Sequence, residues 1–412
     1  MQFSTTNYGR LKTRIKRRYQ SQLAKTTKAF KSFPQSKTGK WLREHHSEFK
    51  EFNPQRWFYL QQVETLLFFL TNSEVESVDG EFSNLENDIF EKWNKSEFAD
   101  VFLKFLNQRM SFKKASNEST KILDAHLVDL GNLHLLKISA STKDYRMQPS
   151  LGDVKIKKKV SKLLATTLHL EGKELILLTS SLKEMKVFST RIEAAVKIIK
   201  KFSPDSWDRF AAFTEVILPI KQEELVSYSH QELPGTSMIN MYHRDFIDLL
   251  DDLLHENGHH HLNYYLNLDT LIQEPIDCIY YSPWRRTLRP LRGIYHAYFT
   301  FFWAFKLFSD LANSKELDSI WYQFSVAEKE KIFWRAIEEF HMLEYSFQDL
   351  QWAKKQGLIS DLGWDLVKEQ RACVVKLKKK IVVWEKNLRT YKRDLSDLKK
   401  TLIHSRKHYK KI

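Results

Sequence analysis

The feature that most constrains this fold is an apolar stretch of helical periodicity over residues 246–266. Its aliphatic side chains recur every three or four residues, which is the spacing of one face of an α-helix. These positions are Ile247, Leu250, Leu254, Leu262 and Leu266. Four aspartates lie in or just before the first two turns, where acidic residues favour the start of a helix. The pattern therefore predicts one long helix over this stretch.

That helix carries His255-Glu256-Asn257-Gly258-His259, an H-E-x-x-H motif. Residues four apart project from the same helical face, so both imidazoles can bind one metal ion. Glu256 lies one step round the helix and can face a bound water or a co-substrate without being a ligand. Gly258 is costly inside a helix, which suggests close approach by a co-substrate or by a nearby arginine-rich loop. The alternative is two histidines packed in a core or lying on the surface.

A metal site needs a further protein ligand, and His296 is the best candidate because a helix–loop–helix return of 37 residues can bring it back over the metal. It can equally be a histidine packed in an aromatic helix. Glu274 and Glu344 are possible carboxylate ligands. His260 and His261 point away from His259 and are expected to support the site or to lie on the surface. The extended zincin pattern is missing, since the Gly and His that follow the motif in metzincins are Leu262 and Tyr265 here.

Residues 232–303 combine several motifs in a fixed order. Pro234-Gly235 comes before a short predicted strand and the H-E-x-x-H helix. Ser282-Pro283-Trp284-Arg285 follows, and then Arg289-Pro290 and Arg292-Gly293-x-x-His296 at the start of an aromatic helix. This arrangement resembles the HExxH-type peptide modification enzymes of bacterial peptide natural-product pathways. These enzymes are proposed to be 2-oxoglutarate-dependent peptide β-hydroxylases. The resemblance covers roughly residues 215–310, under a third of the chain.

The resemblance implies an Fe(II) site formed by His255, His259 and His296. It implies that Glu256 orients a ligand or moves a proton. The arginines that it covers are Arg285, Arg289 and Arg292, and they would hold the carboxylates of 2-oxoglutarate or of the substrate, because guanidinium groups bind carboxylates through two hydrogen bonds. The substrate would be a ribosomally made precursor peptide, possibly acidic, hydroxylated at a β-carbon.

Two other functions stay open. Imidazole suits zinc as well as iron, and the usual spacing of a two-histidine, one-carboxylate iron site is not evident. A zinc metallopeptidase would use Glu256 as general base toward a metal-bound water. The arginines can instead form structural ion pairs with Asp251, Asp252 or Asp277, and Arg286 is expected to be solvated. A non-catalytic helical scaffold that binds an anionic partner is the third possibility.

Charge is concentrated at the two ends of the chain. Residues 1–40 hold eleven Lys or Arg and no acidic residue, and residues 368–412 hold sixteen Lys or Arg against four Asp or Glu. Since the whole chain carries +15, the middle is acidic, at −8. Basic ends can bind nucleic acid, an anionic membrane surface or an acidic peptide. They can also simply be solvated helix faces.

The remaining patterns predict a mainly α fold with a small β component (α+β). Four segments are expected: a basic helix and linker in 1–40, a helical to mixed region in 41–225, the metal-site region in 226–312, and a hairpin of long helices in 313–412. The basic helix covers 8–31 and the linker 34–39. Short strands are expected at 136–139, 175–178 and 216–218, the last ended by Pro219. Apolar stripes at helical spacing fall at Trp57, Leu60, Val63 and Leu67, and at Phe98, Phe102 and Phe105.

Two long helices are predicted to end the chain, joined by a turn at 357–363. Apolar residues step by three and four along both of them, and in the second they continue over four heptads. An antiparallel hairpin that buries both stripes is the simplest interpretation. A homodimeric coiled coil through 374–402 is the alternative.

Nothing in the sequence predicts secretion or membrane insertion. No apolar segment follows Met1, and the most apolar run, 293–308, is too short to span a bilayer. Two cysteines, Cys278 and Cys373, give no disulfide framework. We therefore expect a soluble cytoplasmic protein.

Overall fold

The computed structural model describes residues 5–34, 36–50, 52, 54–71, 87, 125–129, 134–138, 168–170, 173–175, 182–214, 216–220, 226–229, 235–240, 245–273, 275, 279–317 and 322–409. Long helices dominate and the strands are short, which confirms the mainly α class with a small β component. None of the helices described is long and apolar enough to cross a membrane. The stripe at Phe98, Phe102 and Phe105 lies outside the described residues.

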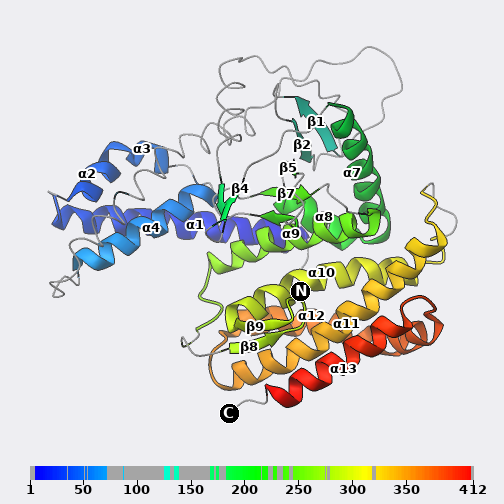
Figure 1. Ribbon diagram of the computed structural model, residues 1–412. Helices are drawn as coiled ribbons and strands as arrows, with labels where there is room; N and C mark the ends of the chain where they lie inside the picture. Colours follow the sequence, from blue (N-terminus) through cyan, green and yellow to red (C-terminus); the bar gives the residue numbers. More distant parts are fainter. Residues whose placement is uncertain are drawn as a thin grey trace.

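An N-terminal arm, residues 5–71, projects from the rest of the molecule (Figure 1). It consists of α1 (Thr5–Ala29), η1 (Phe30–Ser32), α2 (Lys37–Glu44), α3 (His46–Phe49) and α4 (Pro54–Thr71). The predicted basic helix is confirmed. The predicted linker is partly wrong, because Ser36 accepts a hydrogen bond from the Gly39 amide at 3.0 Å and so caps α2 within it.

The arm belongs to two cores. Tyr8, Leu11 and Ile15, in the first half of α1, are buried in the main core of the molecule. Tyr19 and Leu23, in the second half, belong to a smaller core within the arm. That smaller core includes three of the four predicted stripe residues, Trp57, Leu60 and Val63, with Leu67 packed against it.

A five-stranded mixed sheet has the order β1-β2-β5-β7-β6. Its strands are β1 (Ala125–Asp129), β2 (His134–Ile138), β5 (Val216–Ile220), β6 (Tyr228–Ser229) and β7 (Thr236–Asn240), and only β5 and β7 are paired in parallel. A separate pair joins β3 (Leu168–Leu170) to β4 (Lys173–Leu175). The strands predicted at 136–139 and 216–218 correspond to β2 and β5. The strand predicted at 175–178 overlaps β4 at Leu175, and residues 176–178 lie outside the described residues.

Pro219 does not end β5, contrary to prediction. The strand continues to Ile220, and Pro219 is paired with Ile239 of β7. Pairing with β2 stops at Ile217, so the proline lies where one side of the strand has no sheet partner among the described residues. A missing N–H is tolerated at such an edge.

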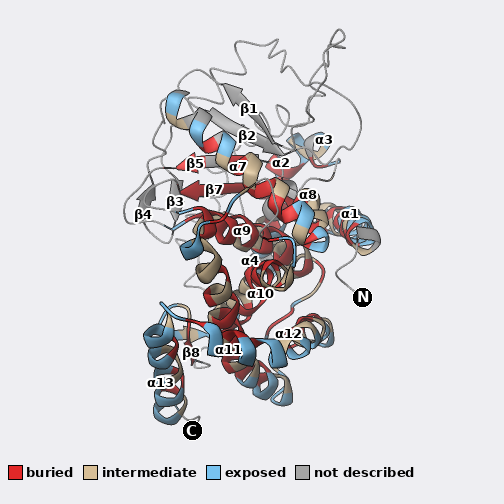
Figure 2. Ribbon diagram, turned by 90° about the vertical axis from the view of Figure 1, so that its right-hand side faces the viewer, coloured by how far each residue is buried: buried red, intermediate tan, exposed pale blue. Residues whose placement is uncertain are grey.

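Helix α9 (Phe246–Leu266) is central to the molecule and matches the predicted stretch. Asp245 caps it by accepting a hydrogen bond from the Asp248 amide at 2.8 Å. Helices α7 (Leu182–Phe202), α8 (Pro204–Phe213) and strand β7 contact one side of it, and α10 (Leu291–Asn313) contacts the other. The hairpin of β8 (Ile279–Ser282) and β9 (Thr287–Pro290) leads into α10. Figure 2 shows α9 and α10 largely buried.

The C-terminal region contains three helices, not the predicted pair: α11 (Val326–Lys355), α12 (Asp361–Asn387) and α13 (Lys392–His408). The expected turn after α11 is confirmed, with Gly357 at φ 75°. The second predicted helix breaks at Leu388, whose ψ of 141° is extended. Glu330 of α11 stabilises the break by accepting hydrogen bonds from the Arg389 and Thr390 amides, at 2.5 and 2.6 Å.

The apolar seam of α12 and α13 is used inside the monomer. The buried side chains are Val374, Ile381, Trp384, Leu388, Leu395 and Leu402. A homodimeric coiled coil through 374–402 would need these same side chains at a subunit interface. Packing within the monomer therefore already accounts for the apolar heptad spacing that suggested a coiled coil.

Candidate metal site

Helix α9 brings His255 and His259 together as predicted. Their Nε2 atoms lie 3.2 Å apart, and their ring planes are inclined at 80°. Two nitrogen ligands, each about 2.1 Å from one tetrahedral ion, are about 3.4 Å apart. The observed separation fits a shared ion. It also fits a hydrogen bond between the two rings.

His296 of α10 lies beside this pair. Its ring centroid is 6.1 Å from that of His259, and its buried Nε2 has no hydrogen-bond partner among the described residues. No group of three or more His, Cys, Asp or Glu side chains is arranged to hold a metal ion in the part of the chain that the structure describes. His296 as the third ligand therefore stays a prediction.

The other proposed ligands differ in outcome. Glu344 forms an ion pair with Arg371 of α12. Glu274 lies outside the described residues. Of the two suggested ligands that the structure describes, His296 is thus the better placed.

Gly258 has a structural role that was predicted wrongly. The sequence suggested that a co-substrate or the arginine-rich loop approaches it, but the neighbour is Thr300 of α10. A Cβ atom at position 258 would lie 3.1 Å from the Thr300 Cα. The glycine therefore allows α9 and α10 to pack closely. This contact lies beside the histidines, because Gly258 directly precedes His259 and Thr300 is one turn after His296.

Burial keeps the histidines of the site neutral at pH 7. It lowers the pKa of His255 to about 4 and that of His296 to about 4, and it lowers the pKa of His259 well below its usual value. Neutral imidazole is the form that ligates metals. The pair is therefore ready to accept an ion without first losing a proton to solvent.

Glu256 faces β6 of the sheet and has 3% of its surface exposed. Burial raises its pKa to about 8, although Ser229 stabilises its charged form through a hydrogen bond. Its Oε2 atom has no hydrogen-bond partner among the described residues. In the absence of a cation, this carboxyl is mostly protonated at neutral pH.

The opposite wall of the pair is aromatic. Phe301 of α10 lies 4.2 Å from the His255 ring, centroid to centroid, and Trp284 stacks on Phe301 at 4.9 Å. Trp284 therefore forms part of this wall. Tyr295 of α10 is buried and donates a hydrogen bond to the Gly363 carbonyl at 2.8 Å.

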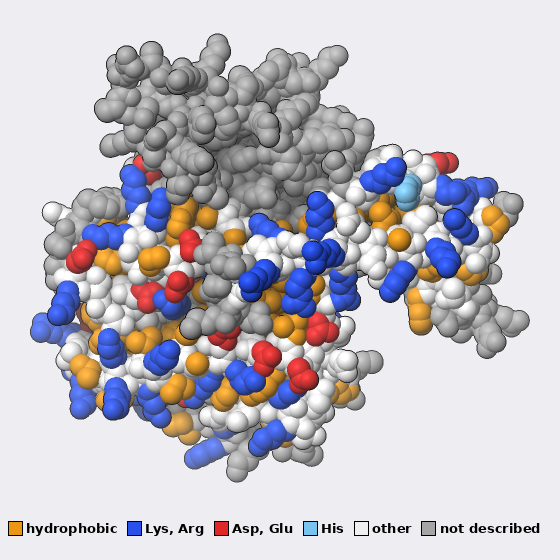
Figure 3. All heavy atoms as spheres, turned by 180° about the vertical axis from the view of Figure 1, so that it is seen from behind, with side chains coloured by type: hydrophobic (Ala, Val, Ile, Leu, Met, Phe, Trp, Pro, Cys, Tyr) orange, Lys and Arg blue, Asp and Glu red, His pale blue; other side chains and the backbone are white. Residues whose placement is uncertain are grey.

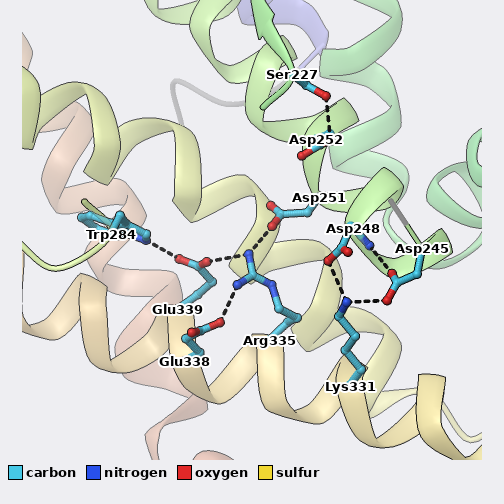
Figure 4. Close-up of polar contacts among 10 residues, drawn as sticks. All are labelled: Ser227, Asp245, Asp248, Asp251, Asp252, Trp284, Lys331, Arg335, Glu338 and Glu339. Carbon is cyan, nitrogen blue, oxygen red and sulfur yellow. Dashed lines mark hydrogen bonds and ion pairs between the residues drawn. The ribbon is translucent and has the colours of Figure 1, made fainter. Parts of the chain in front are cut away.

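A buried ion network, which the sequence did not reveal, supports this wall (Figure 4). The Trp284 indole donates to Glu339 at 2.7 Å, and Arg335 of α11 is paired with Glu339, Glu338 and Asp251. Asp251 is one turn before His255 on the same face of α9. The spacing of four residues from His255 was the only sequence signal for Asp251, and nothing in the sequence identified Arg335 as its partner.

The four loop arginines occupy different positions. Electrostatic interaction with Arg285 lowers the pKa values of His255 and His259, and Arg292 has the same effect on His296, in each case as a smaller contribution than burial. Arg289 is half-buried on β9 with its stem against Gly293, and Arg286 is exposed, as predicted.

Two of the three aspartates proposed as structural partners of these arginines interact elsewhere. Asp251 pairs with Arg335, and Asp252 accepts a hydrogen bond from Ser227 at 2.7 Å. Asp277 lies outside the described residues. Among the four loop arginines, Arg285 and Arg292 are the two whose charges act on the histidines of the site; Arg335 and Arg209 also act on His255.

A cavity of about 260 Å³ lies next to the site. His296 and Arg292 line one part of it, and Ile15 of α1 and Gln61 of α4 line another.

His260 also lines this cavity and is buried, accepting a hydrogen bond from the Gly235 amide at 3.3 Å. His261 is buried as well and stacks on Phe213 at 4.5 Å. A surface position for these two histidines was therefore a wrong expectation.

Comparison with protein-family models finds no match for this chain, and comparison with curated proteins finds none either. A functional assignment therefore depends on the residues of the site. The features that bear on it are a neutral histidine pair, two nearby guanidinium groups, an aromatic wall and an adjoining cavity.

Proposed function

We propose that the protein is an Fe(II)- and 2-oxoglutarate-dependent oxygenase that hydroxylates a β-carbon in a ribosomally made peptide. The observation that carries the proposal is the pair His255 and His259, whose neutral Nε2 atoms lie 3.2 Å apart on a buried helix. When bound, Fe(II) with 2-oxoglutarate supplies the oxidising power to insert an oxygen atom of O2 into a C–H bond.

The residues fit such a site in three respects. His255 and His259 would hold the metal, and His296 is the nearest further imidazole. Arg285 puts positive charge near His255 and Arg292 puts it near His296, and a guanidinium group can bind a carboxylate. Phe301 and Trp284 exclude water from one face of His255. Arg289, predicted with the other two arginines, has no contact in the structure that supports the same role.

Glu256 supports a second candidate, a zinc metallopeptidase. It follows His255 directly, and one of its oxygens is buried without a partner among the described residues. A general base must be ionised, and burial opposes ionisation here. A bound cation would favour the charged form of Glu256, which a peptidase needs as its general base. Substitution of Glu256 can therefore distinguish the two activities.

Anaerobic titration tests the proposal without a known peptide. Protein purified without air and loaded with Fe(II) should develop the visible charge-transfer absorption of a chelated 2-oxo acid when 2-oxoglutarate is added. Arg285→Ala or Arg292→Ala should raise the 2-oxoglutarate concentration needed, by about tenfold, because the carboxylate would lose its bidentate partner. Arg286→Ala is the matched control, because Arg286 is exposed like Arg285 and Arg292 but is not among the charges that lower the pKa values of His255 and His296.

Glu256→Gln separates the two classes of enzyme. It should leave formation of the Fe(II)–2-oxoglutarate complex intact, whereas in a zinc peptidase it would remove the general base and with it the activity. Peptide cleavage by the wild type without O2 or 2-oxoglutarate would contradict the oxygenase assignment.

A further inference from the structure

The N-terminal arm forms one wall of the cavity beside the histidines. Ile15 and Gln61 come from the arm, and they line the same cavity as His296 and Arg292 of α10. Phe52, also in the lining, packs against both the main core and the core of the arm. A molecule bound in this cavity would therefore contact the arm.

The exposed side of α1 is strongly basic. The helix contains eight Lys or Arg and no Asp or Glu. Seven of these basic side chains are exposed, and no ion pair joins any of them to an acidic side chain in the described part of the chain: Arg10, Arg14, Lys16, Arg17, Arg18, Lys25 and Lys28. Figure 3 shows Lys and Arg gathered over the arm and the surface next to it.

The basic side chains are close to the cavity. Arg14 and Arg18 are within one helical turn, about 5.4 Å along the axis, of Ile15. Arg292 lines the cavity from the other side. Among the arm residues whose side chains are described, the acidic ones are Glu44 and Glu64. Positive charge therefore lies on the arm next to the cavity and at Arg292 in its lining, where Asp269 contributes one carboxylate.

The chemistry of this surface favours an acidic peptide over a nucleic acid. Single-stranded nucleic acids bind through aromatic side chains that stack on successive bases, and the exposed positions of α1 hold none. The lining offers the amide and hydroxyl groups of Asn263, Asn267 and Thr270, which can hydrogen-bond to a peptide backbone. A volume of about 260 Å³ is below that of pockets for drug-sized ligands and suits a single side chain.

We infer that the exposed basic face of α1 is the docking surface for an acidic segment of the peptide substrate, which directs a neighbouring residue of that peptide into the cavity beside His296. This inference rests on the proposed function for the identity of the partner as a substrate. Binding to α1 itself needs neither metal nor turnover.

Binding of a labelled peptide by fluorescence anisotropy tests the inference. The probe is a peptide of about 15 residues with a Glu/Asp-rich half and a neutral half, beside a version with Gln and Asn in place of Glu and Asp. The triple variant Arg14→Glu, Arg17→Glu, Arg18→Glu should bind the acidic probe about tenfold more weakly or worse, with the difference shrinking at high salt. The neutral probe should bind all proteins weakly.

A matched control reverses the same number of charges elsewhere. Lys376, Lys378 and Lys379 of α12 are exposed and have no ion pair in the described part of the chain. Their triple replacement by Glu should change binding of the acidic probe less than about twofold, because α12 contributes no residue to the lining of the cavity. If the arm variant fails to fold, as judged by circular dichroism, Arg14→Gln with Arg17→Gln and Arg18→Gln replaces it.

Several outcomes would overturn the inference. Equal affinity of the arm variant and the wild type for the acidic probe would do so. So would tighter, arm-dependent binding of a single-stranded RNA oligonucleotide or of phosphatidylserine vesicles. The assay contains no metal or 2-oxoglutarate, so failure here leaves the oxygenase proposal standing. If the peptide binds as expected but the Fe(II)–2-oxoglutarate complex does not form, the docking inference stands and the oxygenase proposal fails.

Discussion

Helix α9 carries two buried polar clusters that differ in charge pairing. One turn before the motif, Asp251 belongs to a network in which Arg335 forms ion pairs with three carboxylates. In the motif itself, no ion pair joins His255, Glu256 or His296 to another side chain in the described part of the chain, although each cluster contains buried atoms without a hydrogen-bond partner there. The two clusters share a helix and lie next to each other, so burial alone does not distinguish them.

The contrast indicates different roles. Buried polar groups in native proteins are nearly always paired, and a paired network contributes to the stability and uniqueness of a core. Unpaired buried groups cost free energy, and they persist where a ligand completes them. The Arg335 network is therefore interpreted as support for the wall of the site, and the histidine cluster as the part that binds.

Removal of the histidine pair should have the largest effect. His255→Ala or His259→Ala should reduce the content of tightly bound metal to background, since one imidazole cannot hold an ion that two share. The melting temperature of the metal-free protein should hardly change, because neither ring is needed to offset a buried charge. Metal analysis of anaerobically purified protein, with thermal melts, measures both.

His341 provides the matched control. It is a partly buried histidine of α11 whose Nε2 lies 2.5 Å from Glu385, outside the site. His341→Ala should leave the metal content unchanged. A loss of metal equal to that of the motif variants would remove the distinction between the two clusters.

Arg335→Met should show the reverse pattern. Loss of the guanidinium leaves Asp251 and the fully buried Glu339 without a counter-charge, which should destabilise the fold by about 3–5 kcal/mol. Urea unfolding at constant pH measures this change. Lys368→Met, which breaks an exposed pair with Asp365, should cost less than about 1 kcal/mol. A change below about 1 kcal/mol for Arg335→Met would mean that the network is not structural.

The sequence predicted the histidine pair and its helix better than their surroundings, for a physical reason. The bounds of α9 and the convergence of His255 and His259 follow from local rules of helical spacing. The pairing of Asp251 with Arg335 joins residues 84 positions apart, and no local pattern specifies it. The apolar repeat likewise continues across Leu388, although the helix stops there, because the hydrogen bonds that stabilise the break come from Glu330 on another helix.

Gly258 connects the two clusters through the packing of α9 on α10. Gly258→Ala would place a Cβ 3.1 to 3.2 Å from atoms of Thr300, so α10 must shift, at a cost of about 1–3 kcal/mol. Gly9→Ala is the matched control, because a Cβ there meets nothing within 4 Å. It should instead stabilise α1 by up to about 1 kcal/mol through helix propensity. Equal effects of the two substitutions in urea unfolding would show that α9 and α10 tolerate a wider separation.

The smallest effect is expected at Glu330. Its carboxylate has hydrogen-bond partners, as that of Asp251 has, but these bonds are exposed to solvent. The Thr390 hydroxyl donates to it at 2.6 Å, and this bond, with the amides of Arg389 and Thr390, lowers the pKa of the carboxyl. A lowered pKa means that its contribution to stability is present above the ordinary value of about 4.5 and is lost as the pH falls through the folded value. Glu330→Gln should therefore destabilise the turn between α12 and α13 at pH 7 by less than about 1 kcal/mol, since solvent screens the charge. The difference from the wild type in urea unfolding should shrink as the pH falls below about 4.5 and the carboxyl becomes protonated. A difference as large as that of Arg335→Met would mean that pairing, and not burial, determines how much a charge contributes in this protein.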